Sequence, residues 1–150
     1  MIDFERILHP TDFSAHSNQA LLHACGLSEQ YGAELHLLHV SPDPAMIMHA
    51  GPSGGYVDPN IAEDVRKQSE ARLAEIPEAG WAEGRAIVRV ALEGVPYVEI
   101  CDYAEENAID LIVLGTHGRS GFAHMLLGSV AERVVRVAKC PVLTVKGEAE

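Results

Sequence analysis

Five short apolar runs, separated by stretches of helical periodicity, constrain the fold of this 150-residue chain more than any other feature. The runs span residues 6–10, 34–40, 86–92, 110–114 and 141–146. Between the first two runs, Ala20, Ala24, Leu27 and Tyr31 recur at the spacing of one helix face. A chain that alternates strands with helices forms a parallel sheet covered on both faces. The sequence therefore predicts a single α/β domain with an open, five-stranded parallel sheet.

The predicted helices differ in how they begin, end and bury their side chains. Ser14 or Ser17 can cap the first helix, and Gly32 is expected to end it. Residues 41–59 have no sustained period and predict a long loop. The predicted buried stripes are Ile61, Val65, Leu73 and Ile76 in a charged second helix, Val98, Cys101, Ala104 and Ala108 in a third that starts at Pro96, and Val130, Val134, Val137 and Ala138 in a fourth.

Composition narrows the classes of function. The net charge of −11, with no cluster of lysine or arginine, argues against binding to nucleic acids or anionic membranes. The three cysteines lie far apart in apolar surroundings, which favours reduced, buried thiols. Neither a signal peptide nor an apolar run long enough to cross a membrane is visible. We therefore expect a cytoplasmic protein.

A glycine-rich stretch follows the fourth run. It holds Gly115, Gly118 and Gly121, then Gly128-Ser129 at the start of the last helix. A strand, a glycine loop and a helix N-terminus can together bind a phosphate. The P-loop lysine is absent, so the donors would be backbone N–H groups, Arg119 and the hydroxyls of Thr116, Ser120 and Ser129. Tight strand–helix packing alone would also explain the glycines, and Ser129 could act only as the helix cap, since Ser129 and Glu132 match the S-x-x-E capping box.

Three strand ends are expected to meet at one edge of the sheet. Pro10-Thr11-Asp12 follows the first run, Val40-Ser41 ends the second, and Gly115 ends the fourth. Ligands of open parallel sheets bind beyond the carboxyl ends of the strands, where the strand order reverses. The carboxylate of Asp12 could accept hydrogen bonds from ribose hydroxyls or hold Mg²⁺ through water, or it could be an ordinary turn residue.

The sequence contains no pattern that requires an enzyme or a metal centre. Its eight histidines are scattered, and the local arrangement with most appeal as a metal site, His117 with His124, lies in the glycine-rich stretch itself. It has no G-x-S-x-G elbow, and no serine or cysteine has an evident paired base. We therefore predict neither a catalytic residue nor a protein-bound metal.

Three motifs together resemble the universal stress protein family, in its ATP-binding form. The family pattern of Gly, two residues, Gly, nine residues, Gly and Ser or Thr is met by Gly115, Gly118 and Gly128-Ser129. The family turn Pro-x-Asp-x-Ser is met by residues 10–14, and residues 139–143 resemble the start of its last strand. The resemblance extends from Arg6 to Lys146.

This resemblance implies a Rossmann-like sheet of strand order 3-2-1-4-5 and a homodimer joined through Val142–Val145. It also implies an adenine nucleotide, ATP with Mg²⁺ bound through the phosphates, in a protein that regulates a stress response. Phe13, where the family often has a small residue, would narrow the ribose side. The implied binding residues are Pro10, Thr11, Asp12, Val40, Gly115, Thr116, His117, Gly118, Arg119, Ser120, Gly121, Gly128, Ser129, Val130 and Ala131.

Three other functions stay open. A slow ATPase or nucleotidyl-transfer enzyme of the same fold would need His117 or Arg119 near the terminal phosphate. The chain could bind flavin or another mononucleotide, and a flavin-bound protein would purify yellow. A scaffold without a ligand would act by dimerisation alone.

Overall fold

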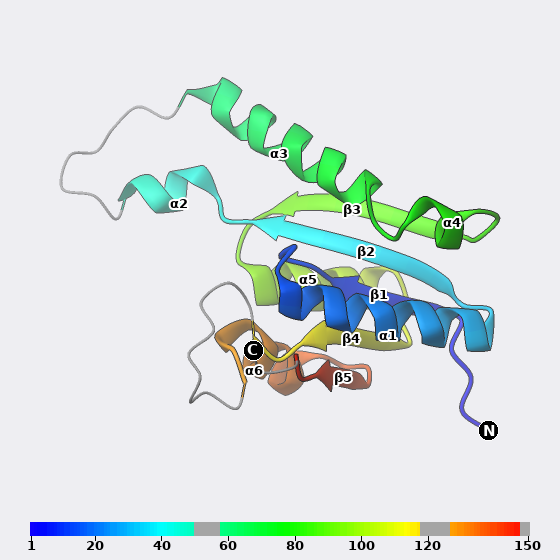
Figure 1. Cartoon of the computed structure of the whole chain (residues 1–150). Helices are drawn as coiled ribbons and strands as arrows, with labels where there is room; N and C mark the ends of the chain where they lie inside the picture. The colour runs from blue at the N-terminus through cyan, green and yellow to red at the C-terminus, as the bar shows by residue number, and fades with distance from the viewer. Residues whose placement is uncertain (50–57, 118–126, 148–150) are drawn as a thin grey trace.

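The computed structural model describes residues 1–49, 58–117 and 127–147 (Figure 1). The strands are β1 (Arg6–Pro10), β2 (Glu34–Ser41), β3 (Ile87–Glu93), β4 (Leu111–Gly115) and β5 (Val142–Val145). The helices are α1 (Ala15–Tyr31), α2 (Pro44–His49), α3 (Pro59–Ala74), α4 (Ala79–Ala82), α5 (Pro96–Glu106) and α6 (Ser129–Val137).

The strands form one parallel sheet in the order β3-β2-β1-β4-β5. Ile7 of β1 pairs with Leu35 of β2 on one side and with Leu111 of β4 on the other. The chain therefore winds outward in one direction through β2 and β3, then returns past β1 to β4 and β5. Both the parallel sheet and its predicted strand order are confirmed.

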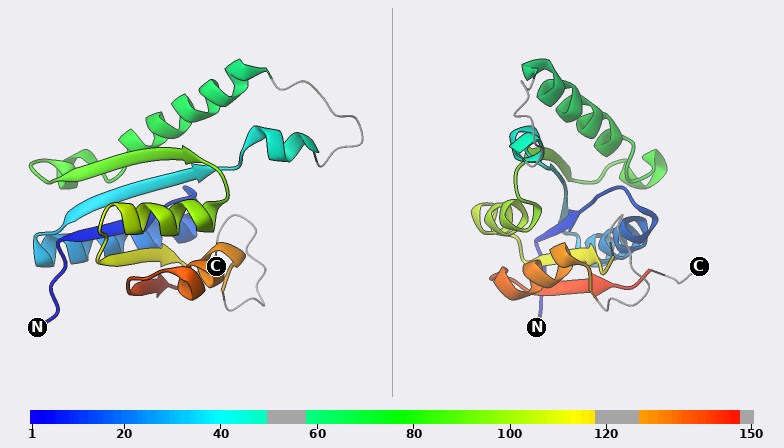
Figure 2. Two further views of the ribbon diagram at one scale, coloured as in Figure 1. Left: turned by 180° about the vertical axis from the view of Figure 1, so that it is seen from behind. Right: turned by 90° about the vertical axis from the view of Figure 1, so that its left-hand side faces the viewer.

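Alternate residues of each central strand face different layers of helices. Ile7, Leu37 and Val113 belong to the core packed against α1 and the end of α3. Leu8 and Ile112 belong to the other core, beneath α5 and α6. Figure 2 shows the two layers on opposite sides of the sheet. Each fully buried Leu or Ile contributes roughly 1.5–3 kcal/mol to the free energy of folding. The burial of both faces of the sheet is therefore strongly favoured.

Local chemistry sets both ends of α1. The hydroxyl of Ser14 accepts a hydrogen bond from the Ser17 backbone N–H at 3.2 Å, so Ser14 is the cap. Gly32 ends the helix in the left-handed conformation, with φ of 66°. A side chain there would be strained, which explains the glycine.

Two short helices were not predicted. Residues 41–59 contain α2, which begins at Pro44, and Asp43 Oδ1 accepts a hydrogen bond from the Ala45 N–H at 2.8 Å. The prediction of a long loop was therefore wrong for residues 44–49, while residues 50–57 lie outside the described part. Helix α4 holds only Ala79–Ala82, which is too short to give a periodic pattern.

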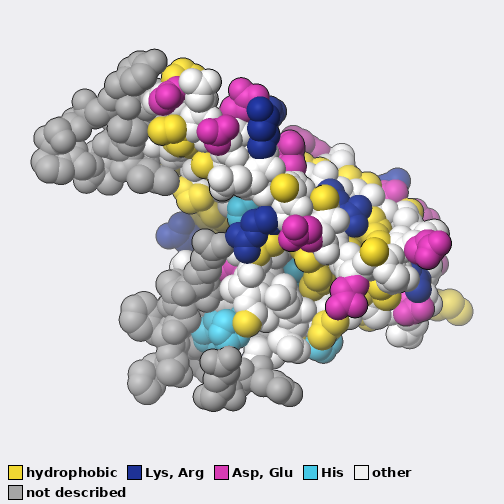
Figure 3. Space-filling model, turned by 45° about the horizontal axis from the view of Figure 1, so that its top comes forward, with side chains coloured by type: hydrophobic (Ala, Val, Ile, Leu, Met, Phe, Trp, Pro, Cys, Tyr) yellow, Lys and Arg dark blue, Asp and Glu magenta, His cyan; other side chains and the backbone are white. Residues whose placement is uncertain are grey.

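Three residues of the predicted buried stripes are exposed in the structure. Ala108 is exposed because α5 ends at Glu106, and Ala108 itself has a φ of 49°. Val137 of α6 and Ile61 of α3 are each 52% exposed. The exposed face of α3 is otherwise charged, with Lys67 paired to Glu63 at 2.9 Å, and Figure 3 shows acidic and basic side chains together over it.

Candidate functional site

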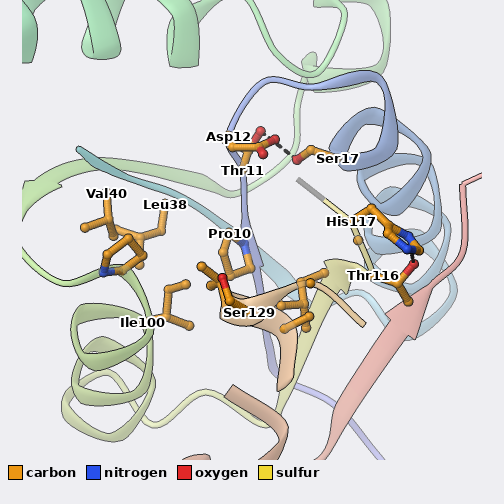
Figure 4. Close-up of a pocket in the computed structure, with 16 residues that line it drawn as sticks. Pro10, Thr11, Asp12, Ser17, Leu38, Val40, Ile100, Thr116, His117 and Ser129 are labelled. Atoms are coloured by element: carbon orange, nitrogen blue, oxygen red, sulfur yellow. Dashed lines mark hydrogen bonds between the residues drawn. The ribbon is translucent and has the colours of Figure 1, made fainter. Parts of the chain in front are cut away.

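A pocket of about 270 Å³ opens where the carboxyl ends of β1, β2 and β4 meet the N-termini of α5 and α6 (Figure 4). Its lining includes eleven residues that the sequence predicted for a binding site: Pro10, Thr11, Asp12, Val40, Gly115, Thr116, His117, Gly128, Ser129, Val130 and Ala131. Gly118, Arg119, Ser120 and Gly121 lie outside the described residues, so their binding roles stay predictions. The predicted convergence of strand ends is present, and the binding roles of the eleven residues stay predictions.

The pocket opens because the sheet splits at its switch point. The register of β1 with β4 covers only Ile7–Leu111 and Leu8–Ile112. Beyond Leu8, β1 continues to pair with β2, through His9 and Pro10. The ends of β1 and β4 therefore separate, and a ligand can enter between the elements that follow them.

The buried ring of His9 bridges this split. Its Nδ1 donates a hydrogen bond to the carbonyl oxygen of Val113 at 2.8 Å, which satisfies a backbone acceptor of β4. Its Nε2 lies 3.4 Å from the Ser17 hydroxyl on α1. Burial is the main reason that the pKa of His9 falls from 6.5 to about 4, although the Val113 carbonyl and the charge of Asp12 act in the opposite direction. The ring is therefore neutral at pH 7.

Hydrogen bonds fix the turn that follows β1. The Ser17 hydroxyl donates to Thr11 Oγ1 at 2.9 Å, and the Phe13 N–H donates to the same oxygen at 3.0 Å. Asp12 Oδ1 accepts from the Ser14 N–H at 2.9 Å. His9, Ser17 and Thr11 thus form a continuous polar connection from the sheet to the pocket wall. It orients a hydroxyl and a carboxylate beside the pocket.

An apolar end of the pocket lies away from His117. Figure 4 shows Leu38, Val40 and Ile100 at one side, Thr116 and His117 at the other, and Ser129 between them. This arrangement offers an apolar slot at one end and polar groups at the other. The pattern suits a flat aromatic ring joined to a polar, charged group.

The N-terminus of α6 faces the pocket, but its cap differs from the prediction. Gly128 is the N-cap residue and Ser129 is the first helical residue, with no side-chain cap bond. The capping-box interpretation of Ser129 was therefore wrong, because the helix begins at Ser129 itself, one residue earlier than that motif requires. The first-turn N–H groups, on Ser129, Val130 and Ala131, lack acceptors within a helix and carry the positive end of its dipole.

The described residues also bear on two other classes of function, metal binding and membrane insertion. In residues 1–49, 58–117 and 127–147, histidine, cysteine and acidic side chains form no group of three or more that could hold a metal ion. No helix in the same ranges has the length and apolarity needed to span a membrane.

The family of the chain follows from its match to known proteins. A model of the universal stress protein family matches residues 3–146. The chain belongs to the universal stress protein family. The universal stress protein MJ0531 of Methanocaldococcus jannaschii is 36% identical over 143 residues, which cover 95% of this chain and 82% of that protein. YxiE of Bacillus subtilis is 31% identical over 147 residues, covering 95% of this chain and 99% of its own length.

Solved universal stress protein structures share the fold. MJ0577 of M. jannaschii superposes with a TM-score of 0.83 at 27% identity, covering 99% of this chain and 100% of that chain. A universal stress protein in complex with cAMP has a TM-score of 0.71 at 26% identity, covering 96% of this chain and 98% of that chain.

Sequence reasoning missed part of this universal stress protein's pocket. Ser17, Leu38, Pro96, Ile100 and Leu114 also line it. Leu38 and Leu114 could have been predicted, since each lies shortly before a predicted site residue on the same strand. Pro96 and Ile100 come from α5, whose N-terminus approaches the pocket only because β3 lies beside β2. Nothing in their local sequence indicates that position.

Gly115 permits a close approach between β4 and α1. A Cβ at this position would lie 3.0 Å from the carbonyl oxygen of His16 and 3.2 Å from its carbonyl carbon. Both are backbone atoms that cannot rotate away. We predict that Gly115→Ala lowers the free energy of unfolding by about 1–3 kcal/mol, measured by urea denaturation.

Gly26 is the matched control for this prediction. It lies within α1 and a Cβ there would meet nothing within 4 Å. Gly26→Ala is expected to stabilise the protein by roughly 0.5–1 kcal/mol through helix propensity. Equal, favourable effects at both positions would show that β4 and α1 do not require the glycine.

Proposed function

We propose that this universal stress protein binds an adenine nucleotide, ATP with Mg²⁺, and acts in the cytoplasm as a nucleotide-dependent regulatory homodimer in a stress response. The observation that carries the proposal is the composition of the pocket. One pocket combines an apolar slot, the hydroxyl and carboxylate of Thr11 and Asp12, and the N-terminus of α6. These features match the base, sugar and phosphates of a nucleotide.

Each part of the nucleotide has a proposed position. The adenine lies in the slot formed by Leu38, Val40 and Ile100, where burial of its faces drives binding. Asp12 accepts hydrogen bonds from the ribose hydroxyls. The phosphates lie at the first turn of α6, where backbone N–H groups donate and the helix dipole favours negative charge. The glycine loop, with Arg119 and Ser120, is proposed to complete the phosphate site.

Mg²⁺ fits this site only together with the nucleotide. The ion prefers oxygen ligands and retains several waters. Asp12 is the acidic side chain among the pocket residues, so it can contribute at most part of such a shell. The phosphates would supply further oxygens, and the ion would offset their repulsion with a chain of net charge −11.

A solved relative supports the ligand class. The universal stress protein in complex with cAMP, which carries an adenine, a ribose and a phosphate, covers 96% of this chain at 26% identity. The choice of ATP over other adenine nucleotides comes from the glycine pattern of the sequence.

Thermal unfolding tests the proposal. Mg-ATP at about 100 times its Kd is expected to add about 2.7 kcal/mol to the free energy of unfolding, because the ligand binds only the folded state. Calorimetric scans with Mg-ATP, Mg-GTP and Mg²⁺ alone measure this effect. An unmoved Tm with every nucleotide would contradict the proposal, and an equal shift with GTP would contradict the assignment of adenine.

A slow ATPase is the second candidate, favoured by one contact. His117 lines the pocket, and its Nδ1 lies 2.9 Å from Thr116 Oγ1. An imidazole held there could orient water near a terminal phosphate. Formation of ADP or AMP by the wild type, and its loss in His117→Ala, would favour this candidate over simple binding.

The homodimer is proposed from the edge of the sheet. β5 is an outer strand in the sheet order and Leu143 on it is 37% exposed. An uncovered apolar edge strand invites pairing with a second copy. Antiparallel pairing of Val142–Val145 about a twofold axis would cover it. A monomeric mass at all concentrations in sedimentation equilibrium would rule out this part of the proposal.

A further inference from the structure

Phe13 has a strained backbone within the turn that carries Thr11 and Asp12. Its φ is 62°, in the left-handed region that bulky side chains rarely adopt. Such a conformation persists only where the surrounding contacts enforce it, and it is frequent at functional sites. The contacts of Phe13 therefore indicate what holds the pocket turn in place.

The ring of Phe13 packs outside the pocket, between two other elements. The His39 ring at the end of β2 lies 4.7 Å away between centroids. The guanidinium carbon of Arg72, on α3, lies 4.1 Å from the ring centroid in a cation–π contact. Phe13 adjoins the core beneath α1 and α3 and is absent from the pocket lining. The expectation that Phe13 narrows the ribose side was therefore wrong.

Hydrogen bonds of β2 hold the other side of the turn. His39 Nδ1 donates to the Thr11 carbonyl oxygen at 2.7 Å, and the Thr11 N–H donates to the Leu38 carbonyl oxygen at 2.8 Å. These bonds fix Thr11 but do not fix φ of the residue that follows Asp12. The cation–π contact of Arg72 links α3 to that residue, beside the packing of the Phe13 ring against the core that Leu73 of α3 joins.

The C-terminal end of α3 is firmly attached to the sheet. Leu73, next to Arg72, is 1% exposed. Arg89 of β3 donates through Nε to the carbonyl oxygens of Leu73 at 2.9 Å and Ile76 at 3.1 Å. Arg72 therefore projects from a fixed backbone, although α3 contributes no residue to the pocket lining.

We propose that Arg72 is a positioning residue for the nucleotide, acting through the ring of Phe13. The inference rests on the proposed nucleotide-binding function. Without the guanidinium, the strained turn relaxes part of the time, and Asp12 and Thr11 leave their binding positions. A ligand that needs the ordered turn then binds more weakly, because its affinity is multiplied by the fraction of molecules in which the turn is ordered. Binding in the pocket and the contact from α3 are thereby coupled. The coupling is reciprocal, so a bound ligand also favours the turn conformation that Arg72 contacts.

Arg72→Met tests this inference, because methionine keeps an apolar stem and removes the cation. The Kd for Mg-ATP, measured by titration calorimetry, is expected to rise by up to about fivefold, the limit that the loss of one exposed cation–π contact sets. Arg72→Lys restores a cation and is expected to recover part of the loss. Arg66→Met is the matched control, since Arg66 lies on the same helix beside Glu70 at 4.0 Å. Its Kd should equal that of the wild type.

A second readout needs no ligand. The Phe13 and Ser14 N–H groups donate within the turn, so their hydrogen exchange in the nucleotide-free protein reports its order. Both are expected to exchange faster in Arg72→Met and at the wild-type rate in Arg66→Met. Unchanged exchange, or an unchanged Kd, in Arg72→Met would overturn the inference. If the wild type binds no nucleotide but exchange is still faster in Arg72→Met, the proposed function would be contradicted. The dependence of the turn on Arg72 would then stand by itself.

Discussion

Acidification from pH 6.5 to about 4 is expected to reduce the free energy of unfolding by about 3 kcal/mol through His9 alone. The pKa of His9 falls from 6.5 to about 4 in the folded protein, chiefly because the ring is buried. The unfolded chain therefore takes up a proton more readily than the folded one. The stabilising contribution is complete above pH 6.5 and is lost as the pH falls toward 4.

The structural reason is the position of His9 at the split of the sheet. A protonated ring would place a charge at a site that is 0% exposed, between β1, β4 and α1. Burial of an uncompensated charge is strongly unfavourable. Acid is therefore expected to weaken the contact of α1 with the sheet, and with it the wall of the pocket.

His9→Asn isolates this effect, since its side-chain amide can still donate to the Val113 carbonyl oxygen but does not titrate. The variant is expected to be less stable than the wild type at pH 7, and the difference should shrink as the pH falls. Urea denaturation between pH 7 and pH 4 measures both curves. His23→Asn, an exposed position on α1, is the control and should follow the wild type. Parallel curves for His9→Asn and the wild type would show that His9 does not set the acid response.

Ser129→Asp is expected to change stability and nucleotide affinity in opposite directions. Ser129 is exposed, lines the pocket and is the first residue of α6. A carboxylate in a first helical turn interacts favourably with the helix dipole, by about 0.3–1 kcal/mol. The same carboxylate would repel phosphates bound at that turn. At about 5 Å and an effective dielectric constant of about 20, the repulsion is about 3 kcal/mol per unit charge.

Affinity for Mg-ATP should therefore fall roughly tenfold or more, with unchanged or slightly increased stability. Calorimetric titration gives the affinity and thermal unfolding gives the stability. Gln68→Glu, on the exposed side of α3, adds a negative charge away from the pocket and is the control. Undiminished affinity in Ser129→Asp would show that the phosphates do not lie at the N-terminus of α6.

The sheet and most of the described site could be predicted because both depend on local patterns. Apolar runs such as residues 110–114 mark buried strands, and ligands of parallel sheets bind at the strand ends. Thr11, Val40 and Gly115 could therefore be placed together without a structure. The family resemblance added the strand order and the first turn of α6.

The features that escaped prediction depend on long-range geometry. The bridging role of His9 follows from where the β1–β4 ladder ends, which no local pattern reveals. Ile100 reaches the pocket only through the placement of β3 beside β2. The cap of α6 is Gly128 because the chain enters the helix there, although Ser129 and Glu132 have the spacing of a capping box. Ala108 has the spacing of the α5 stripe, but α5 ends at Glu106.

Calorimetric titration of Mg-ATP into the nucleotide-free protein tests the central claim most directly. We predict saturable binding of one nucleotide per chain, with competition by AMP and ADP and a loss of affinity in Ser129→Asp. The absence of binding heat at several temperatures, together with a Tm that nucleotides do not change, would contradict the proposal that this pocket holds an adenine nucleotide.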